Sequence, residues 1–328
     1  MTKYIIKRIL YMIFVFVIMS VILFSLYEMI PGDPARAEVE HLKTQLKADE
    51  YEKAYQQARK DWGLDDPIYE KYLKWARGML KGELGWSNIH KKDVSILIKD
   101  PLKNTLFINI FSVIAGLVIT IPLGVFCAIK KNSRFDRTVQ VLTIIGHSIP
   151  SFIFGLLFIF VFAVKLRKFP VSGMSTPNLK GTDWIILKDR IWHLALPLMV
   201  MTISTLAGIT RYVRAAMIDA LSMDYIKTAR AKGLKEKVVI WSHAWRNALL
   251  PIVTLLVGWI ASIFYGALII ESMFGLNGLG KYLVDSLHNK DFSVVMAIQL
   301  LYIVVALLSN LITDISYGIV DPRVRVNK

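Results

Sequence analysis

The sequence predicts an all-α, polytopic membrane protein with six transmembrane helices, an external helical insert and a short cytoplasmic helix. Hydrophobic residues make up 55% of the 328 residues and charged residues only 20%. The apolar residues gather in long uncharged blocks. About 20 helical residues cross a hydrocarbon core of ~30 Å, and a helix satisfies its own backbone hydrogen bonds there. Six blocks are long enough: residues 9–27, 104–129, 138–164, 191–210, 247–270 and 292–313.

The distribution of Lys and Arg predicts how these helices are oriented, because basic residues concentrate in cytoplasmic segments. Residues 211–246 hold eight Lys or Arg against three acidic residues, whereas residues 31–103 hold 14 basic and 13 acidic ones. We therefore expect both termini in the cytoplasm and residues 31–103 outside. The segment 164–190 argues the other way, with six basic and two acidic residues, but the other connections outweigh it.

Three regions follow along the chain. Residues 1–30 are a cytoplasmic leader and a first transmembrane helix, which is longer than the apolar part of a signal peptide. Residues 31–103 are the external insert, and residues 104–328 are a core of five membrane helices. Within the insert, composition predicts a helix over 38–62, a turn at 63–67 and an amphipathic helix over 68–80. Pro31-Gly32-Asp33-Pro34 ends the first membrane helix.

Prolines recur inside the predicted spans, and a polar pair lies beside one of them. Proline kinks occur in membrane helices for packing reasons and also where a structure opens and closes, and both interpretations stay open. His147 lies within the third span next to Ser148. It is either bonded to its own helix or exposed to a polar pathway. The prolines concerned are Pro122, Pro150, Pro197 and Pro251.

No catalytic, cofactor-binding or metal-ligating constellation emerges from the sequence. Gly275 and Gly280-Lys281 match most of a phosphate-binding loop, but Tyr282 stands where Ser or Thr would contact Mg²⁺, so we expect a glycine-rich turn. The six histidines have no metal-ligand spacing. The formal charge of +15 indicates anchoring at a membrane surface and not binding of nucleic acid.

Carboxylates in the spans are few and lie near helix ends, at Glu28, Glu271 and Asp314. An ion-coupled transporter usually places such a group near the middle of the membrane. The pattern therefore favours a protein that receives energy from a separate subunit.

The polar segment that follows the fourth span is the strongest candidate for a functional site. Ser222 is predicted to cap its helix, and Gly233 is predicted to end it in the left-handed conformation. Tyr225, Thr228, Ala229 and Lys232 follow helical spacing on one face. Small residues there would let another protein approach closely, although an ordinary surface helix explains the spacing equally well. The segment continues Thr228-Ala229-Arg230-Ala231-Lys232-Gly233-Leu234.

These seven residues resemble the coupling motif of permease subunits of ABC importers, specifically of the dipeptide/oligopeptide (DppB/OppB-type) branch. The resemblance covers nearly the whole chain. The general importer motif begins Glu-Ala-Ala, where this chain has Lys227-Thr228-Ala229, as is typical of the peptide branch. Further matching motifs are Pro31-Gly32-Asp33-Pro34, Gly63-Leu64-Asp65, Ile121-Pro122-Leu123-Gly124, Ser148-x-Pro150-Ser151-Phe152, Pro170-Val171-Ser172-Gly173, Leu250-Pro251, Glu271-x2-Phe274 and Asp321-Pro322-Arg323.

The resemblance implies a permease subunit of the bacterial cytoplasmic membrane that is not itself an enzyme. A second homologous permease would complete the pathway for peptides. Two cytoplasmic ATPase subunits, which carry the ATP and Mg²⁺, would dock on coupling helices at about residues 222–234. An extracellular or periplasmic binding protein would deliver the substrate. The docking residues would be Tyr225, Thr228, Ala229, Arg230, Ala231, Lys232, Gly233 and Leu234.

Alternatives remain at this point. Members of the family also carry nickel chelates, glutathione or other small solutes. A secondary transporter or channel with a regulatory helix is a different class, and a membrane-embedded enzyme is more distant still, because no nucleophile–base pair lies in or near a span.

Overall fold

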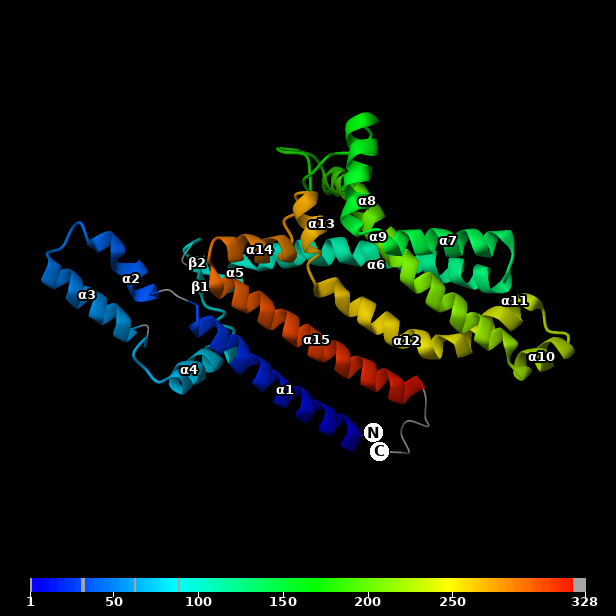
Figure 1. Ribbon diagram of the computed structural model, residues 1–328, viewed down its shortest axis with the longest axis horizontal. Coiled ribbons are helices and arrows are strands. Elements are labelled where there is room, and N and C mark those ends of the chain that lie inside the picture. The colour runs from blue at the N-terminus through cyan, green and yellow to red at the C-terminus, as the bar shows by residue number, and fades with distance from the viewer. Residues whose placement is uncertain (1, 31–32, 62, 88, 321–328) are drawn as a thin grey trace. The chain divides into compact units, whose positions relative to one another are not determined.

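The computed structural model describes residues 2–30, 33–61, 63–87 and 89–320, and these residues are mostly helical (Figure 1). They form two compact units. The larger consists of Met1–Met12, Ile98–Asp285 and Val304–Lys328, and the smaller of Ile13–Leu97 and Ser286–Ile303. Three helices run from one unit into the other, namely α1 (Thr2–Glu28), α14 (Leu279–His288) and α15 (Phe292–Val320).

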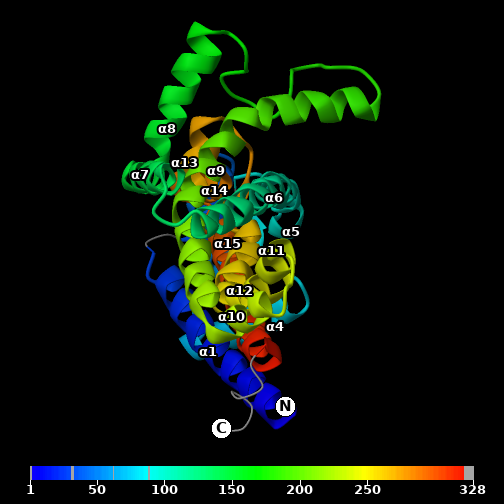
Figure 2. The ribbon, with the colours of Figure 1, turned by 90° about the vertical axis from the view of Figure 1, so that its right-hand side faces the viewer.

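The larger unit is a bundle of long helices around two apolar clusters. Its two longest helices, α6 (Lys99–Ile129) and α9 (Asp183–Ser222), pack against each other. Its other elements are α7 (Arg134–Ser148), α8 (Ser151–Phe158), the π-helical η2 (Ile159–Lys165), α10 (Asp224–Ala231), α11 (Glu236–Val238), the π-helical η3 (Val239–Ala244), α12 (Trp245–Ala261), the 3₁₀ turn η4 (Ser262–Phe264) and α13 (Leu268–Met273). Figure 2 shows the irregular loop that joins η2 to α9.

The smaller unit contains most of α1 and the elements that follow it. These are α2 (Pro34–Val39), the 3₁₀ turn η1 (Glu40–Leu42), α3 (Ala48–Asp61), α4 (Ile68–Leu80), an antiparallel pair of two-residue strands β1 (Trp86–Ser87) and β2 (Lys92–Asp93), and α5 (Val94–Leu97). The two strands pair Trp86 with Asp93 and Ser87 with Lys92.

Within the described residues, five helical stretches are long and apolar enough to cross a membrane, and a sixth arises if one bent pair is a single span. The predicted all-helical membrane fold is therefore confirmed. Small residues let the long helices approach each other, as is common in membranes. A Cβ on Gly124 of α6 would lie 2.7 Å from the Val213 side chain of α9, and a Cβ on Gly116 would collide with Trp259 of α12.

The third predicted span, over 138–164, is not one straight helix. The chain forms α7 and α8 instead, with a bend of 97° between them (Figure 1). Pro150 has no N–H to continue α7, and a residue before proline avoids helical geometry. Ile149 is accordingly extended, with φ −88° and ψ 125°. In contrast, Pro122, Pro197 and Pro251 lie inside helices without ending them.

The fifth predicted span, over 247–270, is confirmed as one stretch over Pro251–Met273, but it is not a uniform α-helix. α12 ends at Ala261, the 3₁₀ turn η4 follows, and α13 begins at Leu268. Between α12 and α13, backbone carbonyls lack helical partners, and Asn109 of α6 donates hydrogen bonds to two of them. Its Nδ2 lies 2.9 Å from the carbonyl oxygen of Ile263 and 2.8 Å from that of Tyr265. A side chain can replace helical hydrogen bonds in this way at membrane depth.

The helix over 68–80 is confirmed as α4, but the one over 38–62 divides. Ala35 and Val39 of α2 are buried against Ala58 of α3, so the chain folds back between these helices. Asp33 caps α2 by accepting the Arg36 N–H at 3.0 Å. Pro31, Gly32 and Trp62 lie outside the described residues.

Candidate functional site

The predicted site is a separate short helix, α10, between α9 and α11. Its C-terminal turn has the Schellman arrangement. The Gly233 N–H donates to the Arg230 carbonyl at 2.9 Å, and the Leu234 N–H donates to the Ala229 carbonyl at 3.4 Å. Gly233 has φ +75°, which confirms the predicted left-handed end of the helix.

The N-terminal boundary differs from the prediction. Ser222 is not the cap: α9 continues to Ser222, whose hydroxyl donates to the Asp219 carbonyl at 2.7 Å. Met223 is extended and begins α10 without a side-chain cap. The hydroxyl of Ser222 thus bonds to its own helix, as serine hydroxyls near helix ends often do. Because α9 includes Ser222, only Met223 separates α9 from α10.

One face of α10 belongs to the core of its own chain. Ile226 is fully buried and Ala229 is 5% exposed, in a cluster with Met217 of α9 and with Val239 and Ile240 of η3. Ala229 was predicted to permit close approach of another protein. The structure places it against the chain's own side chains, so its small size serves to seat α10 on α9 and η3.

The opposite face of α10 is open. Tyr225 and Leu234 are each 40% exposed, and the other predicted contact residues, Thr228, Arg230, Ala231, Lys232 and Gly233, are exposed as well. Three large apolar side chains near them in the sequence are also exposed, namely Met223, Val238 and Trp241. Exposed apolar groups beside charged ones are typical of a protein–protein contact. These three were not among the predicted contact residues, although the i, i+3 spacing of Val238 and Trp241 could have indicated two of them.

An ion pair fixes the turn that follows α10. Arg230 approaches Glu236 of α11 with Nη2 at 2.6 Å from Oε1 and Nε at 3.2 Å from Oε2. The hydrogen bond from Arg230 lowers the pKa of the Glu236 carboxyl below its ordinary value. Arg230 is therefore held in one orientation across the Gly233 turn.

In the glycine-rich segment 275–281, a carboxylate of the chain itself takes the place that a phosphate would have. The carboxylate of Glu271 accepts the Lys281 N–H at 2.8 Å, the Ala267 N–H at 3.2 Å and the Thr105 hydroxyl at 3.1 Å. A Cβ on Gly278 would lie within 2.6 Å of a Glu271 oxygen. The Lys281 N–H, which would face a phosphate in such a loop, binds this carboxylate instead. The expected turn is present at Gly275, whereas Gly280 and Lys281 lie in the first turn of α14.

The other two carboxylates predicted near span ends also have partners. Asp314 of α15 lies 3.1 Å from Nη1 of Arg8. Glu28 of α1 lies 3.1 Å from Nζ of Lys71 in α4. Each of the three is thus engaged in the structure, by a cation or, for Glu271, by hydrogen-bond donors.

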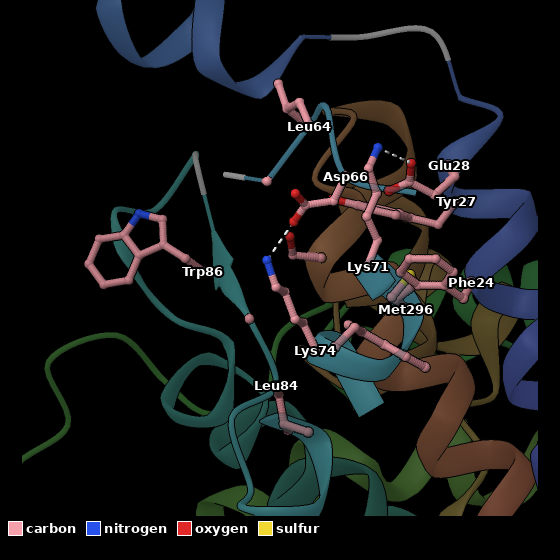
Figure 3. Close-up of a pocket in the computed structure, with 14 residues that line it drawn as sticks. Phe24, Tyr27, Glu28, Leu64, Asp66, Lys71, Lys74, Leu84, Trp86 and Met296 are labelled. Carbon is pink, nitrogen blue, oxygen red and sulfur yellow. Dashed lines mark hydrogen bonds and ion pairs between the residues drawn. The ribbon is translucent and has the colours of Figure 1, made fainter. Parts of the chain in front are cut away.

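The smaller unit contains a cleft of about 270 Å³ between α1, α4 and the start of α15 (Figure 3). Phe24 and Trp75 form part of its apolar wall, with ring centroids 5.3 Å apart. Lys74 pairs with Asp66 at 2.5 Å, and its pKa is raised by this hydrogen bond. Together with the Lys71–Glu28 pair, the cleft presents balanced charge.

The described architecture is that of a polytopic helical membrane protein with one short, exposed polar helix seated on its bundle. The chain belongs to the family described as "Binding-protein-dependent transport system inner membrane component", whose model matches residues 120–326. A companion model for the N-terminal part of such membrane components matches residues 1–108. The protein is thus a membrane permease subunit of a binding-protein-dependent ABC transport system, and not an enzyme.

Similar proteins include three full-length permeases. The chain is 40% identical over 325 residues to the oligopeptide transport system permease AppB of Bacillus subtilis, with 99% of each chain covered. It is 33% identical over 347 residues to the dipeptide transport system permease DppB of Escherichia coli K12, with 100% of each covered. It is 32% identical over 325 residues to the glutathione transport system permease GsiC of Escherichia coli O6:H1, with 99% of each covered.

Solved structures of similar fold include a methionine transporter. The MetNI methionine ABC transporter, in an inward-facing conformation, matches with a TM-score of 0.51 and 17% identity, over 66% of this chain and 95% of the other. The similarity concerns the arrangement of helices.

Proposed function

We propose that this permease imports short peptides in an ATP-driven complex, and that α10 is the coupling helix on which an ATPase subunit docks. The open face of α10 supports this most directly. Ile226 and Ala229 anchor the helix in the bundle, while Tyr225 and its exposed neighbours remain available to a partner. A helix packed in this way transmits a movement of the bound ATPase subunit to α9 and η3, because closely packed protein interiors are hardly compressible.

The proposal includes the rest of the complex. A second homologous permease completes the pathway, two cytoplasmic ATPase subunits supply ATP and Mg²⁺, and a binding protein outside the membrane delivers the substrate. The protein lies in the bacterial cytoplasmic membrane, with both termini and α10 on the cytoplasmic side. Alternating access then follows from closure of the ATPase pair.

Peptides are the proposed substrates because the similar permeases AppB and DppB are named for oligopeptide and dipeptide transport. Glutathione is a second candidate, favoured by the similarity to GsiC. Both are small molecules with peptide bonds, so the same pathway chemistry suits them. The external binding protein determines which one is delivered.

The test is uptake into liposomes that contain the permease with its partner permease and ATPases. We expect uptake of a labelled peptide, carried by the binding protein, only when ATP is supplied. Competition by unlabelled di- and oligopeptides, but not by glutathione, supports peptide transport, and the reverse supports the second candidate. Flux through the permease alone, driven by an ion gradient, contradicts the proposal and favours a secondary transporter.

A further inference from the structure

The break between α7 and α8 lies at a depth where irregular backbone needs an explanation. Basic residues before and at the start of α7, such as Lys131 and Arg134, indicate where the chain enters the membrane surface. The 15 residues of α7 extend about 22 Å at 1.5 Å per residue, which places its end inside a hydrocarbon core of ~30 Å. Non-helical backbone occurs at such depth only where it is buried in protein or lines a water-filled cavity.

The polar residues at this break are not buried in their own chain. His147 and Ser148 are both exposed, as is the adjacent Pro150. Next to them, Gly146 is buried and faces α9, where a Cβ on it would lie 3.7 Å from that of Ala207. The break therefore packs through Gly146 and presents its imidazole and hydroxyl outward.

The exposed part of α7 near the break carries both polar and apolar side chains. Gln140 lies two turns earlier on the same side, and its Nε2 is buried without a partner among the described residues. Ile145, one turn before Ser148, is 47% exposed, and Ile144, one turn before His147, is 49% exposed, so apolar side chains are exposed beside both polar ones. Contact of apolar side chains with lipid costs nothing, whereas a polar group in lipid is unfavourable. His147 and Ser148 therefore need a polar surrounding at the end of a helix whose exposed neighbours do not.

We propose that His147 and Ser148 line the aqueous pathway through which the substrate crosses the membrane. This inference rests on the proposed transport of peptides. A neutral imidazole and a hydroxyl each donate and accept hydrogen bonds. Peptide groups carry one donor and one acceptor each, so the two side chains match a peptide backbone whatever its side chains are. The site would therefore contact substrates with little preference for sequence.

Cysteine accessibility tests this assignment in the assembled transporter. The native Cys127 is fully buried, so it gives little background. Vesicles that hold the complete complex are treated with a charged, membrane-impermeant thiol reagent, from either side. The variants are His147→Cys and the conservative Ser148→Cys, with Leu142→Cys as the matched control. Uptake of peptide by the parent protein is measured in the same vesicles.

We expect His147→Cys and Ser148→Cys to react on the order of tenfold faster than Leu142→Cys, because the reactive thiolate forms in water and not in an apolar environment. Trapping the ATPases in their closed state is expected to change the side from which these two thiols react. Reaction no faster than that of Leu142→Cys, in vesicles where the parent transports peptide, overturns the inference and leaves the proposed function intact. Absence of uptake in the parent overturns the proposed function instead.

Discussion

Arg214 of α9 binds Asp136 of α7 through two nitrogens, with Nε and Nη2 each 2.6 Å from a carboxylate oxygen. Asp136 is 1% exposed and also accepts the Asn132 N–H at 2.9 Å. The pair joins the beginning of α7 to the part of α9 that leads into α10. A bidentate pair of this kind fixes orientation as well as distance.

Removing one member of this pair is expected to weaken the bundle strongly. Arg214→Ala leaves the Asp136 carboxylate buried without its cation, which typically costs about 3 to 5 kcal/mol. Arg214→Lys keeps the charge but loses the two-point geometry, so its effect is intermediate. The thermal unfolding midpoint of the purified complex measures both. Arg211→Ala, at an exposed position of the same helix, is the control. Equal midpoints for Arg214→Ala and Arg211→Ala contradict this role.

The two alanines of α10 distinguish packing of the helix against its own chain from contact with a partner protein. A large side chain at Ala229 overfills the buried cluster and destabilises the protein by about 1 to 3 kcal/mol. Ala231 is exposed, so Ala231→Trp leaves folding unchanged and obstructs a partner. We expect Ala229→Trp to lower the unfolding midpoint, and Ala231→Trp to abolish uptake at a normal midpoint. Normal uptake by Ala231→Trp removes the docking hypothesis for this face.

Gly233 ends α10 at φ +75°, a conformation that a β-branched residue adopts only with strain. Gly233→Val is expected to unwind the last turn and to reduce uptake while the protein stays in the membrane. Gly233→Asn is expected to be milder, because asparagine tolerates this region. Uptake per inserted protein measures the difference. Equal uptake for the two variants shows that the geometry of this turn is not needed for coupling.

The hydrogen bonds around Glu271 predict sensitivity to small changes. Glu271→Gln replaces one acceptor oxygen by an amide that faces N–H and O–H donors, which costs about 1 to 3 kcal/mol for each donor left unsatisfied. Gly278→Ala introduces a Cβ that collides with the same carboxylate. Both variants are expected to lower the unfolding midpoint. Gly82→Ala is the comparison for the collision, because a Cβ there has nothing within 4 Å, although its φ of +84° adds some strain. If Gly278→Ala lowers the unfolding midpoint no more than Gly82→Ala does, the close packing of Gly278 against Glu271 is contradicted.

The Arg230–Glu236 pair predicts a small dependence of stability on pH. Because the folded state lowers the pKa of Glu236, the pair stabilises the protein above the ordinary pKa of this carboxyl. This contribution is lost as the pH falls through the lowered value. Since both side chains are about half exposed, the effect is below about 1 kcal/mol. The difference in unfolding midpoint between the parent and Glu236→Gln is expected to shrink toward acidic pH. A difference that grows there contradicts the assigned sign.

The sequence predicted the features of the fold that depend only on neighbouring residues. Apolar block length predicted the spans, and Gly233 predicted the end of α10, because each depends on nearby residues alone. The break at Pro150 was visible as a proline, but its 97° bend depends on how α8 packs, which local pattern does not contain. Likewise, Ala229 and Ala231 look equivalent in sequence, and only the position of Ile240 and Met217 distinguishes the buried one. The hydrogen bonds of Asn109, and the one between Thr105 and Glu271, join residues more than 150 positions apart and left no local signal.

The central claim is that the open face of α10 meets an ATPase subunit, and photocrosslinking tests it most directly. A photoreactive phenylalanine analogue replaces Tyr225 in the complete transporter, and in a second protein it replaces Tyr69 of α4, a tyrosine that is 62% exposed against 40% for Tyr225. The account predicts a covalent product with the ATPase from position 225 and none from position 69. A product between position 225 and the external binding protein, or the absence of any ATPase product from an actively transporting complex, would contradict it.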